Sequence, residues 1–168
     1  GRYFFNGIDT ETNGLDIVAT MREDVANGSL LLKAAMNFND TEVTNKGELE
    51  TPAELAAYTS SLLLGRANTV RYESSSPAEN FQFSATLQKP TSTFMWKLNR
   101  WGEVTIPAST VEREQVLGSK WTVDMEYSFQ LNSQVRMALG ANNVFDVYPD
   151  KTIKRNSFNG IFQHSGYS

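Results

Sequence analysis

The sequence predicts an all-β fold: an antiparallel, up-and-down transmembrane β-barrel segment of about six strands in three hairpins. Apolar and polar residues alternate over long stretches, which is typical of strands with one apolar face. Short connections between these stretches alternate with long ones, which predicts short turns at one end of the sheet and long loops at the other. No apolar run approaches the ~20 residues that a membrane-spanning helix needs.

The first hairpin is predicted over residues 8–22 and 28–44, separated by the turn sequence Asn27-Gly28. In the first of these stretches Leu15 begins an apolar series and Asp16 begins the opposite, polar series. The second stretch continues the alternation, so both strands are expected to have one apolar face.

The second hairpin is predicted over residues 80–88 and 93–106. Between them, Lys89-Pro90-Thr91-Ser92 supplies a proline, which fixes φ and ends the strand. The third hairpin is predicted over residues 119–130 and 134–146, and it shows the clearest alternation. Every odd position from Trp121 to Phe129 is apolar and every even position is polar.

The longest loop contains a predicted short helix at 52–63. Thr51-Pro52-Ala53-Glu54 offers an N-cap, a proline at the first helical position and a glutamate in the first turn. Leu55, Tyr58 and Leu62 follow at helical spacing, and Gly65 can end the segment.

The apolar faces can contact either of two environments, a protein core or lipid. A soluble β-sandwich or small β-barrel that binds a ligand or partner would bury them in a core, whereas a membrane barrel turns them to lipid and keeps polar residues in its lumen. Large aromatic residues near strand ends and a strongly polar opposite face favour the membrane barrel. The residues predicted to face lipid are Leu15, Ile17, Leu32, Ala34, Phe83, Leu98, Val123, Met125, Met137 and Leu139; those predicted to face the lumen are Asp16, Lys33, Lys97, Asp124, Glu126 and Arg136.

Composition argues against most enzyme classes. Cysteine is absent and His164 is the single histidine, so there is no thiol chemistry and no basis for a histidine-built zinc site or a Ser-His-Asp triad. No glycine-rich phosphate loop occurs. The net charge of −4 argues against a partner rich in phosphates, such as nucleic acid. We therefore expect no enzymatic activity, no catalytic residue, no metal and no cofactor.

Charged residues are the remaining candidates for a site. Asp146 and Asp150, near Lys151, would form either a loop cation site or two solvated carboxylates. Four basic residues are placed on lumen faces, where they would guide an anionic substrate or pair with acidic neighbours or with a plug domain: Lys33, Lys97, Arg100 and Arg136.

Several segments resemble TonB-dependent outer-membrane receptors. Gly140-Ala141-Asn142-Asn143-Val144-Phe145-Asp146-Val147-Tyr148-Pro149 is similar to the segment that ends their penultimate barrel strand, usually written G-x-N-N-L/V-F-D-x-x-Y. Gly14-Leu15-Asp16-Ile17, the aromatic-rich Phe94–Val104 stretch and Ser76-Pro77-Ala78-Glu79-Asn80 resemble other strands and connections of these barrels, in the family's order.

The resemblance implies that residues 1–168 are the C-terminal portion of such a barrel in the bacterial outer membrane, with the plug domain and the final strand outside the chain, since membrane barrels start at about eight strands. It implies import of a scarce nutrient (an iron chelate, cobalamin or an oligosaccharide) with TonB-coupled energy. The implied partners are outer-membrane lipid, the remainder of the barrel, the plug domain, the TonB system through the N-terminal region, and the small-molecule or oligosaccharide substrate. The substrate-binding residues are not indicated.

Overall fold

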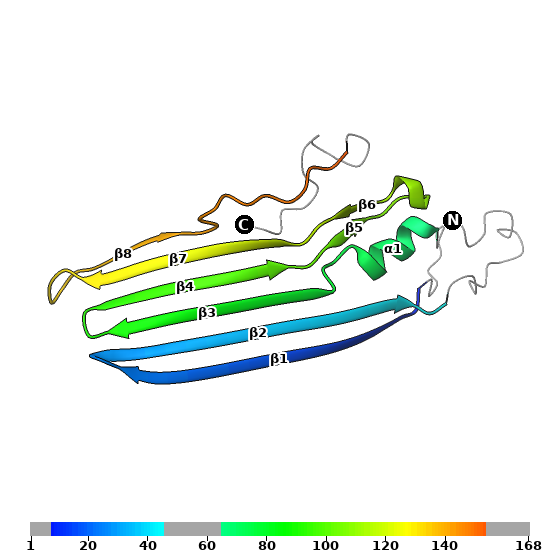
Figure 1. The fold of residues 1–168 in the computed structure, drawn as a ribbon. Helices are drawn as coiled ribbons and strands as arrows, with labels where there is room; N and C mark the ends of the chain where they lie inside the picture. Colours follow the sequence, from blue (N-terminus) through cyan, green and yellow to red (C-terminus); the bar gives the residue numbers. More distant parts are fainter. Residues whose placement is uncertain (1–7, 46–64, 154–168) are drawn as a thin grey trace, which may run out of the picture.

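The computed structural model describes residues 8–45 and 65–153. In these ranges the chain is mostly antiparallel β-sheet with one α-helix, which confirms the predicted all-β class. The main sheet has six strands in the order β1-β2-β3-β4-β7-β8 (Figure 1). Their bounds are β1 Thr10–Val25, β2 Gly28–Val43, β3 Glu79–Lys89, β4 Ser92–Trp101, β7 Lys120–Gln130 and β8 Arg136–Ala141.

The connections are sorted as predicted. The short turns after β1, β3 and β7 lie at one end of the sheet, and the longer connections lie at the other (Figure 1). In the first turn Asn27 has a φ of 60°, a left-handed conformation that asparagine tolerates better than most residues. The opposite end, which we call the loop end, holds α1 (Arg66–Ser74), a small hairpin of β5 (Val104–Ile106) and β6 (Gln115–Leu117), and the short 3-10 helix η2 (Val111–Arg113).

The prediction of one strand over 93–106 was wrong, because the segment forms two strands, β4 and β5. The chain leaves β4 after Trp101 and enters β5 at Val104. At the break, the Gly102 N–H donates to the Glu79 carbonyl at 3.0 Å. A Cβ at Gly102 would lie 2.4 Å from that oxygen, so only glycine fits this close approach. The loop predicted at about 106–119 accordingly contains the second strand of a hairpin, β6, as well as η2.

The last predicted strand, 134–146, is shorter than expected. Regular pairing of β8 with β7 ends at Ala141. Two residues beyond it have positive φ, 48° at Asn143 and 54° at Asp146, and such residues cannot continue an extended strand. The apolar series at odd positions also ends at Ala141, because asparagine occupies position 143.

The helix predicted at 52–63 lies outside the described residues. The helix that is described, α1, was not predicted, because its sequence has no apolar stripe and buries only Val70. It is held by tertiary contacts with β2 and β5. One of these is a hydrogen bond of 3.0 Å from the Val43 N–H to Glu73 Oε1.

The strand register confirms that the predicted residues divide between two faces. Directly opposed residues in an antiparallel sheet point to the same side, and successive residues alternate. All ten residues predicted to face lipid therefore share one face, the apolar face, and the six predicted to face the lumen share the other, the polar face. One apolar row runs across the whole sheet through Met21, Leu32, Ala85, Trp96, Met125 and Ala141.

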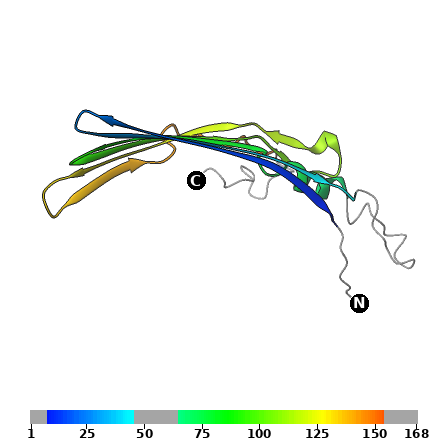
Figure 2. The ribbon, with the colours of Figure 1, turned by 90° about the horizontal axis from the view of Figure 1, so that it is seen from below.

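The main sheet is a single open layer within the described residues. It curves along its length, and β1 and β8 form its two edges without pairing to each other, so it does not close into a barrel (Figure 2). The buried hydrophobic cluster lies instead at the loop end, where Val104, Ile106 and Leu117 pack in the β5–β6 hairpin. In residues 8–45 and 65–153, no helix is both long and apolar enough to cross a bilayer.

Candidate functional site

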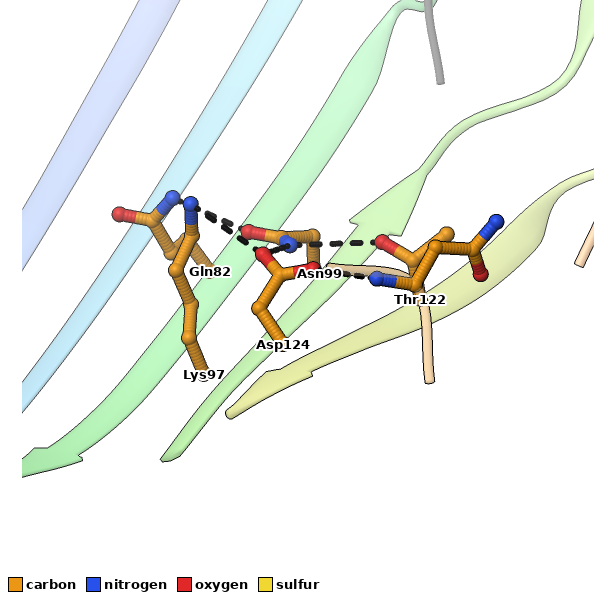
Figure 3. A network of polar contacts seen from close by, with 6 residues as sticks. Gln82, Lys97, Asn99, Thr122 and Asp124 are labelled. Carbon is orange, nitrogen blue, oxygen red and sulfur yellow. Dashed lines mark hydrogen bonds and ion pairs between the residues drawn. The ribbon is translucent and has the colours of Figure 1, made fainter. Parts of the chain in front are cut away.

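Side chains from β3, β4 and β7 form a hydrogen-bonded network on the polar face (Figure 3). Asn99 is at its centre: its Oδ1 accepts from Gln82 Nε2 at 3.1 Å, and its Nδ2 donates to Thr122 Oγ1 at 3.3 Å and to Asp124 Oδ2 at 3.1 Å. Asn99 and Thr122 are only 8% and 3% exposed. Buried polar groups need such partners because an unsatisfied one costs about 1–3 kcal/mol.

Asp124 connects this network to two other parts of the chain. Its Oδ1 accepts from the Asn143 N–H at 2.8 Å, and its Oδ2 lies 3.6 Å from Lys97 Nζ. Both carboxylate oxygens are therefore used by neighbouring donors. The network holds three strands and the segment after β8 in register, and it does not present a nucleophile beside a free base.

The segment that carries the receptor-like motif is held by its own side chains. Asn143 Nδ2 donates to the Val147 carbonyl at 2.9 Å, and the Val147 N–H donates to Asn143 Oδ1 at 3.0 Å. The Asp146 N–H donates to the Asn143 carbonyl at 2.8 Å. A hydrogen bond to Asp146 raises the pKa of the Tyr148 hydroxyl above its usual value. Asn143 and Asp146 thus stabilise the turn out of the strand.

Three of the four basic candidates lie on the polar face, and the fourth does not. Lys33, Lys97 and Arg136 share that face, whereas Arg100 is directly opposed to Phe81 and Trp121 on the apolar face. Placing Arg100 on the polar face was wrong, because strand alternation puts it on the same side as Leu98, two positions earlier.

Arg100 has apolar-face partners at the loop end. Its Nη2 lies 2.6 Å from Glu79 Oε1, and its guanidinium lies 5.9 Å from the centre of the Trp121 ring. Arg136 also has partners: its Nη2 donates to Thr93 Oγ1 and to Ser128 Oγ, each at 3.1 Å. Lys33 and Lys97 are thus the basic candidates whose ammonium groups make no side-chain hydrogen bond among the described residues.

Asp150 makes structural contacts with two residues near the start of β7. Asp150 Oδ1 lies 2.6 Å from Lys120 Nζ, and its Oδ2 accepts from the Gly118 N–H at 2.7 Å. The hydrogen bond from Lys120, followed by the one from Gly118, lowers the pKa of Asp150 below its usual value. No group of three or more His, Asp or Glu side chains in residues 8–45 and 65–153 is arranged to hold a metal ion.

The sequence pattern named Lys97 and Asp124 but not Gln82, Asn99 or Thr122. These three residues lie at ordinary polar positions of their strands, and only the register of β3, β4 and β7 brings them together.

In comparisons with known proteins, no family model, no curated protein and no solved structure matches the chain.

Proposed function

We propose that this chain forms part of the wall of an outer-membrane receptor of the TonB-dependent type, which imports a scarce nutrient. In this proposal the apolar face contacts lipid, the polar face lines the lumen, and the loop end faces the cell exterior. The rest of the barrel, the plug domain and the TonB system are its partners, and the nutrient is an iron chelate, cobalamin or an oligosaccharide.

The observation that carries the proposal is the exposed apolar face of the main sheet. Ile17, Met21, Met137 and Leu139 are 46%, 51%, 43% and 66% exposed, and no second layer covers them within the described residues. Soluble monomers rarely expose contiguous apolar patches larger than a few hundred Å². Lipid is a solvent in which such a face is stable.

Aromatic residues lie at both ends of this face, which agrees with the girdles of membrane barrels. At the loop end, the Phe81 and Trp121 rings contact edge to face with centroids 5.9 Å apart. At the turn end, the Tyr127 and Phe129 rings stack at 5.7 Å. The eight steps from Trp121 to Phe129, at ~3.4 Å each and tilted by ~40°, span about 21 Å, close to the ~25 Å apolar band.

The two open edges also fit the proposal. β1 is exposed along its whole length, and its outer edge has no partner strand among the described residues. In lipid, unpaired backbone N–H and C=O groups each cost several kcal/mol, on the order of a lost hydrogen bond or more. We therefore expect β1 and β8 to pair with further strands of the barrel wall.

Tryptophan quenching tests the proposal. Trp96 lies in the apolar row that crosses the sheet, whereas Trp101 lies on the polar face. Two variants, each retaining one of these tryptophans with the others changed to phenylalanine, are reconstituted in vesicles that contain lipids brominated on their acyl chains. We expect strong quenching of Trp96 and weak quenching of Trp101. Equal quenching of both, or a detergent-free monomer with Trp96 unquenched, would support the soluble β-sandwich or small-barrel alternative instead.

A further inference from the structure

We propose that the polar face binds a small multivalent oxyanion, one with carboxylate or phosphate oxygens, above Ser84 and between Lys33 and Lys97. This inference rests on the proposed function and deepens it by naming a class of substrate. Two observations support it: the register of the adjacent strands β2, β3 and β4, and the small number of acidic groups that contact the two lysines.

The register places the two lysines on either side of one hydroxyl group. Lys33 of β2 is directly opposed to Ser84 of β3, and Ser84 is directly opposed to Lys97 of β4. Two strand spacings of ~4.8 Å put the lysine Cα atoms about 10 Å apart. Lysine has a flexible four-carbon stem with three donors at its end, so both ammonium groups can reach an anion above Ser84. The serine hydroxyl supplies a further donor.

Lys33 lacks a compensating negative charge. Its side chain is exposed and makes no hydrogen bond or ion pair with the described residues. Its directly opposed neighbours, Thr20 and Ser84, are uncharged. Arg22 lies at a diagonal position on the same face and makes no such contact either. The acidic residues on this face of β1, Asp16 and Asp24, each lie four residues along the strand from Thr20, so no directly opposed or diagonal neighbour of Lys33 is acidic.

Lys97 is only partly neutralised. Its side chain is 34% exposed, and Asp124 Oδ2 lies 3.6 Å from its Nζ, beyond hydrogen-bonding distance. That carboxylate already accepts hydrogen bonds from Asn99 and from the Asn143 N–H. Glu126 is the other acidic residue near Lys97, at a diagonal position on β7. Negative charge thus lies on the far side of Lys97, and the anion is placed toward Lys33.

The two ammonium groups favour an anionic ligand between them. Lys33 and Lys97 lie on β2 and β4, on either side of Ser84 in β3, and an oxyanion above Ser84 is attracted to both. A multivalent anion gains from both contacts at once, whereas a monovalent anion has less charge to share between them. The site therefore selects for negative charge and for oxygen acceptors rather than for one particular shape.

Titration calorimetry of the full chain with citrate, pyrophosphate and acetate tests this site. Three variants remove one positive charge each: Lys33→Gln, Lys97→Gln and, as the control, Lys89→Gln, which lies at the turn end of the apolar face. We expect citrate or pyrophosphate to bind, with Kd raised about tenfold by Lys33→Gln and by Lys97→Gln, since a charged hydrogen bond contributes about 1.5–3 kcal/mol. We expect weaker binding of acetate and no effect of Lys89→Gln. A preference for citrate or for pyrophosphate separates a carboxylate substrate from a phosphate substrate.

Two results would overturn the site: unchanged Kd in both Lys33→Gln and Lys97→Gln, or an equal loss in Lys89→Gln. Lys33 makes no contact that folding requires, so its variant is expected to fold, and unchanged circular dichroism verifies this.

Quenching of Trp96 by brominated lipid, measured on the same variants, separates the two proposals. Anion binding that depends on both lysines without quenching of Trp96 keeps the anion site and rejects the membrane barrel. Quenching of Trp96 without anion binding keeps the membrane barrel and rejects the anion site.

Discussion

Asp124 Oδ1 accepts a hydrogen bond of 2.8 Å from the backbone N–H of Asn143, and this contact joins β7 to the segment after β8. On one side of it, β8 pairs with β7 through main-chain groups as far as Ala141. On the other side, the Val144 N–H donates to the Val123 carbonyl at 2.8 Å. Between these two main-chain contacts, the Asp124 carboxylate supplies the acceptor for the Asn143 N–H.

Replacing Asp124 with alanine is expected to destabilise the protein by about 1–3 kcal/mol, because the Asn143 N–H and the buried Asn99 amide each lose an acceptor. Urea unfolding in detergent micelles measures this free energy. The matched control is Glu126→Ala, on the same strand and face but exposed, for which we expect a change within about 0.5 kcal/mol. Similar losses in both variants would show that Asp124 has no special structural role.

The close approach at Gly102 gives a second prediction. Gly102→Ala would place a methyl group 2.4 Å from the Glu79 carbonyl, so either β4 or the start of β3 must shift. We expect a loss of about 1–3 kcal/mol, as for other overpacked sites, measured by thermal or urea unfolding. Glu103→Ala, at the exposed neighbouring position, is the control. A Gly102→Ala variant as stable as the control would contradict the tight contact between these strands.

The assignment of faces gives a third prediction. If the apolar face contacts lipid, Met125→Arg places a charge near the middle of the bilayer and costs about 2–4 kcal/mol. Glu126→Arg, one residue later on the polar face, is expected to cost far less. Unfolding from detergent or vesicles measures both variants. Equal penalties would contradict the proposed orientation.

The Asp150 contact predicts a pH dependence. Since its pKa is lowered in the folded chain, Asp150 stabilises the fold fully above 3.8, the ordinary value for aspartate, and this contribution is lost as the pH falls through the lowered folded value. The difference in unfolding free energy between the wild type and Asp150→Asn should therefore be largest near neutral pH and should shrink below 3.8. A difference that stays constant from pH 7 to pH 3 would mean that the hydrogen bonds from Lys120 and Gly118 do not depend on the charge of Asp150.

Much of the main sheet could be predicted from period-two alternation, and the reason is local. Residues such as Met125 and Glu126 differ in polarity because they point to opposite sides of one strand, so the two faces can be assigned without knowing which strands are neighbours. The turn after β1 was predicted only in part. A turn near Asn27 was expected from the Asn27-Gly28 pair, but the strand expected to end at residue 22 continues to Val25, the turn residues are Ala26 and Asn27, and Gly28 begins β2.

The features that were missed depend on contacts between distant parts of the chain. The break at Gly102 is set by the Glu79 carbonyl on another strand. Helix α1 is held by its neighbours rather than by an amphipathic pattern, and the Asn99 network exists only in the correct register. Arg100 was assigned to the wrong face for a simpler reason. It was placed with the polar residues because it is charged, although the even positions of β4, where it lies, point to the apolar face.

The order of strands in the main sheet has a consequence for how the protein folds. Each strand pairs with the one before it in the chain, except that the β5–β6 hairpin is inserted between β4 and β7. Three pairs close across short turns, and the joins from β2 to β3 and from β4 to β7 each close a longer loop. Doubling the length of a flexible loop adds only about 0.6 kcal/mol to the entropic cost of closing it. The sheet can therefore assemble one hairpin at a time in chain order, and lengthening either long connection should slow its assembly only slightly.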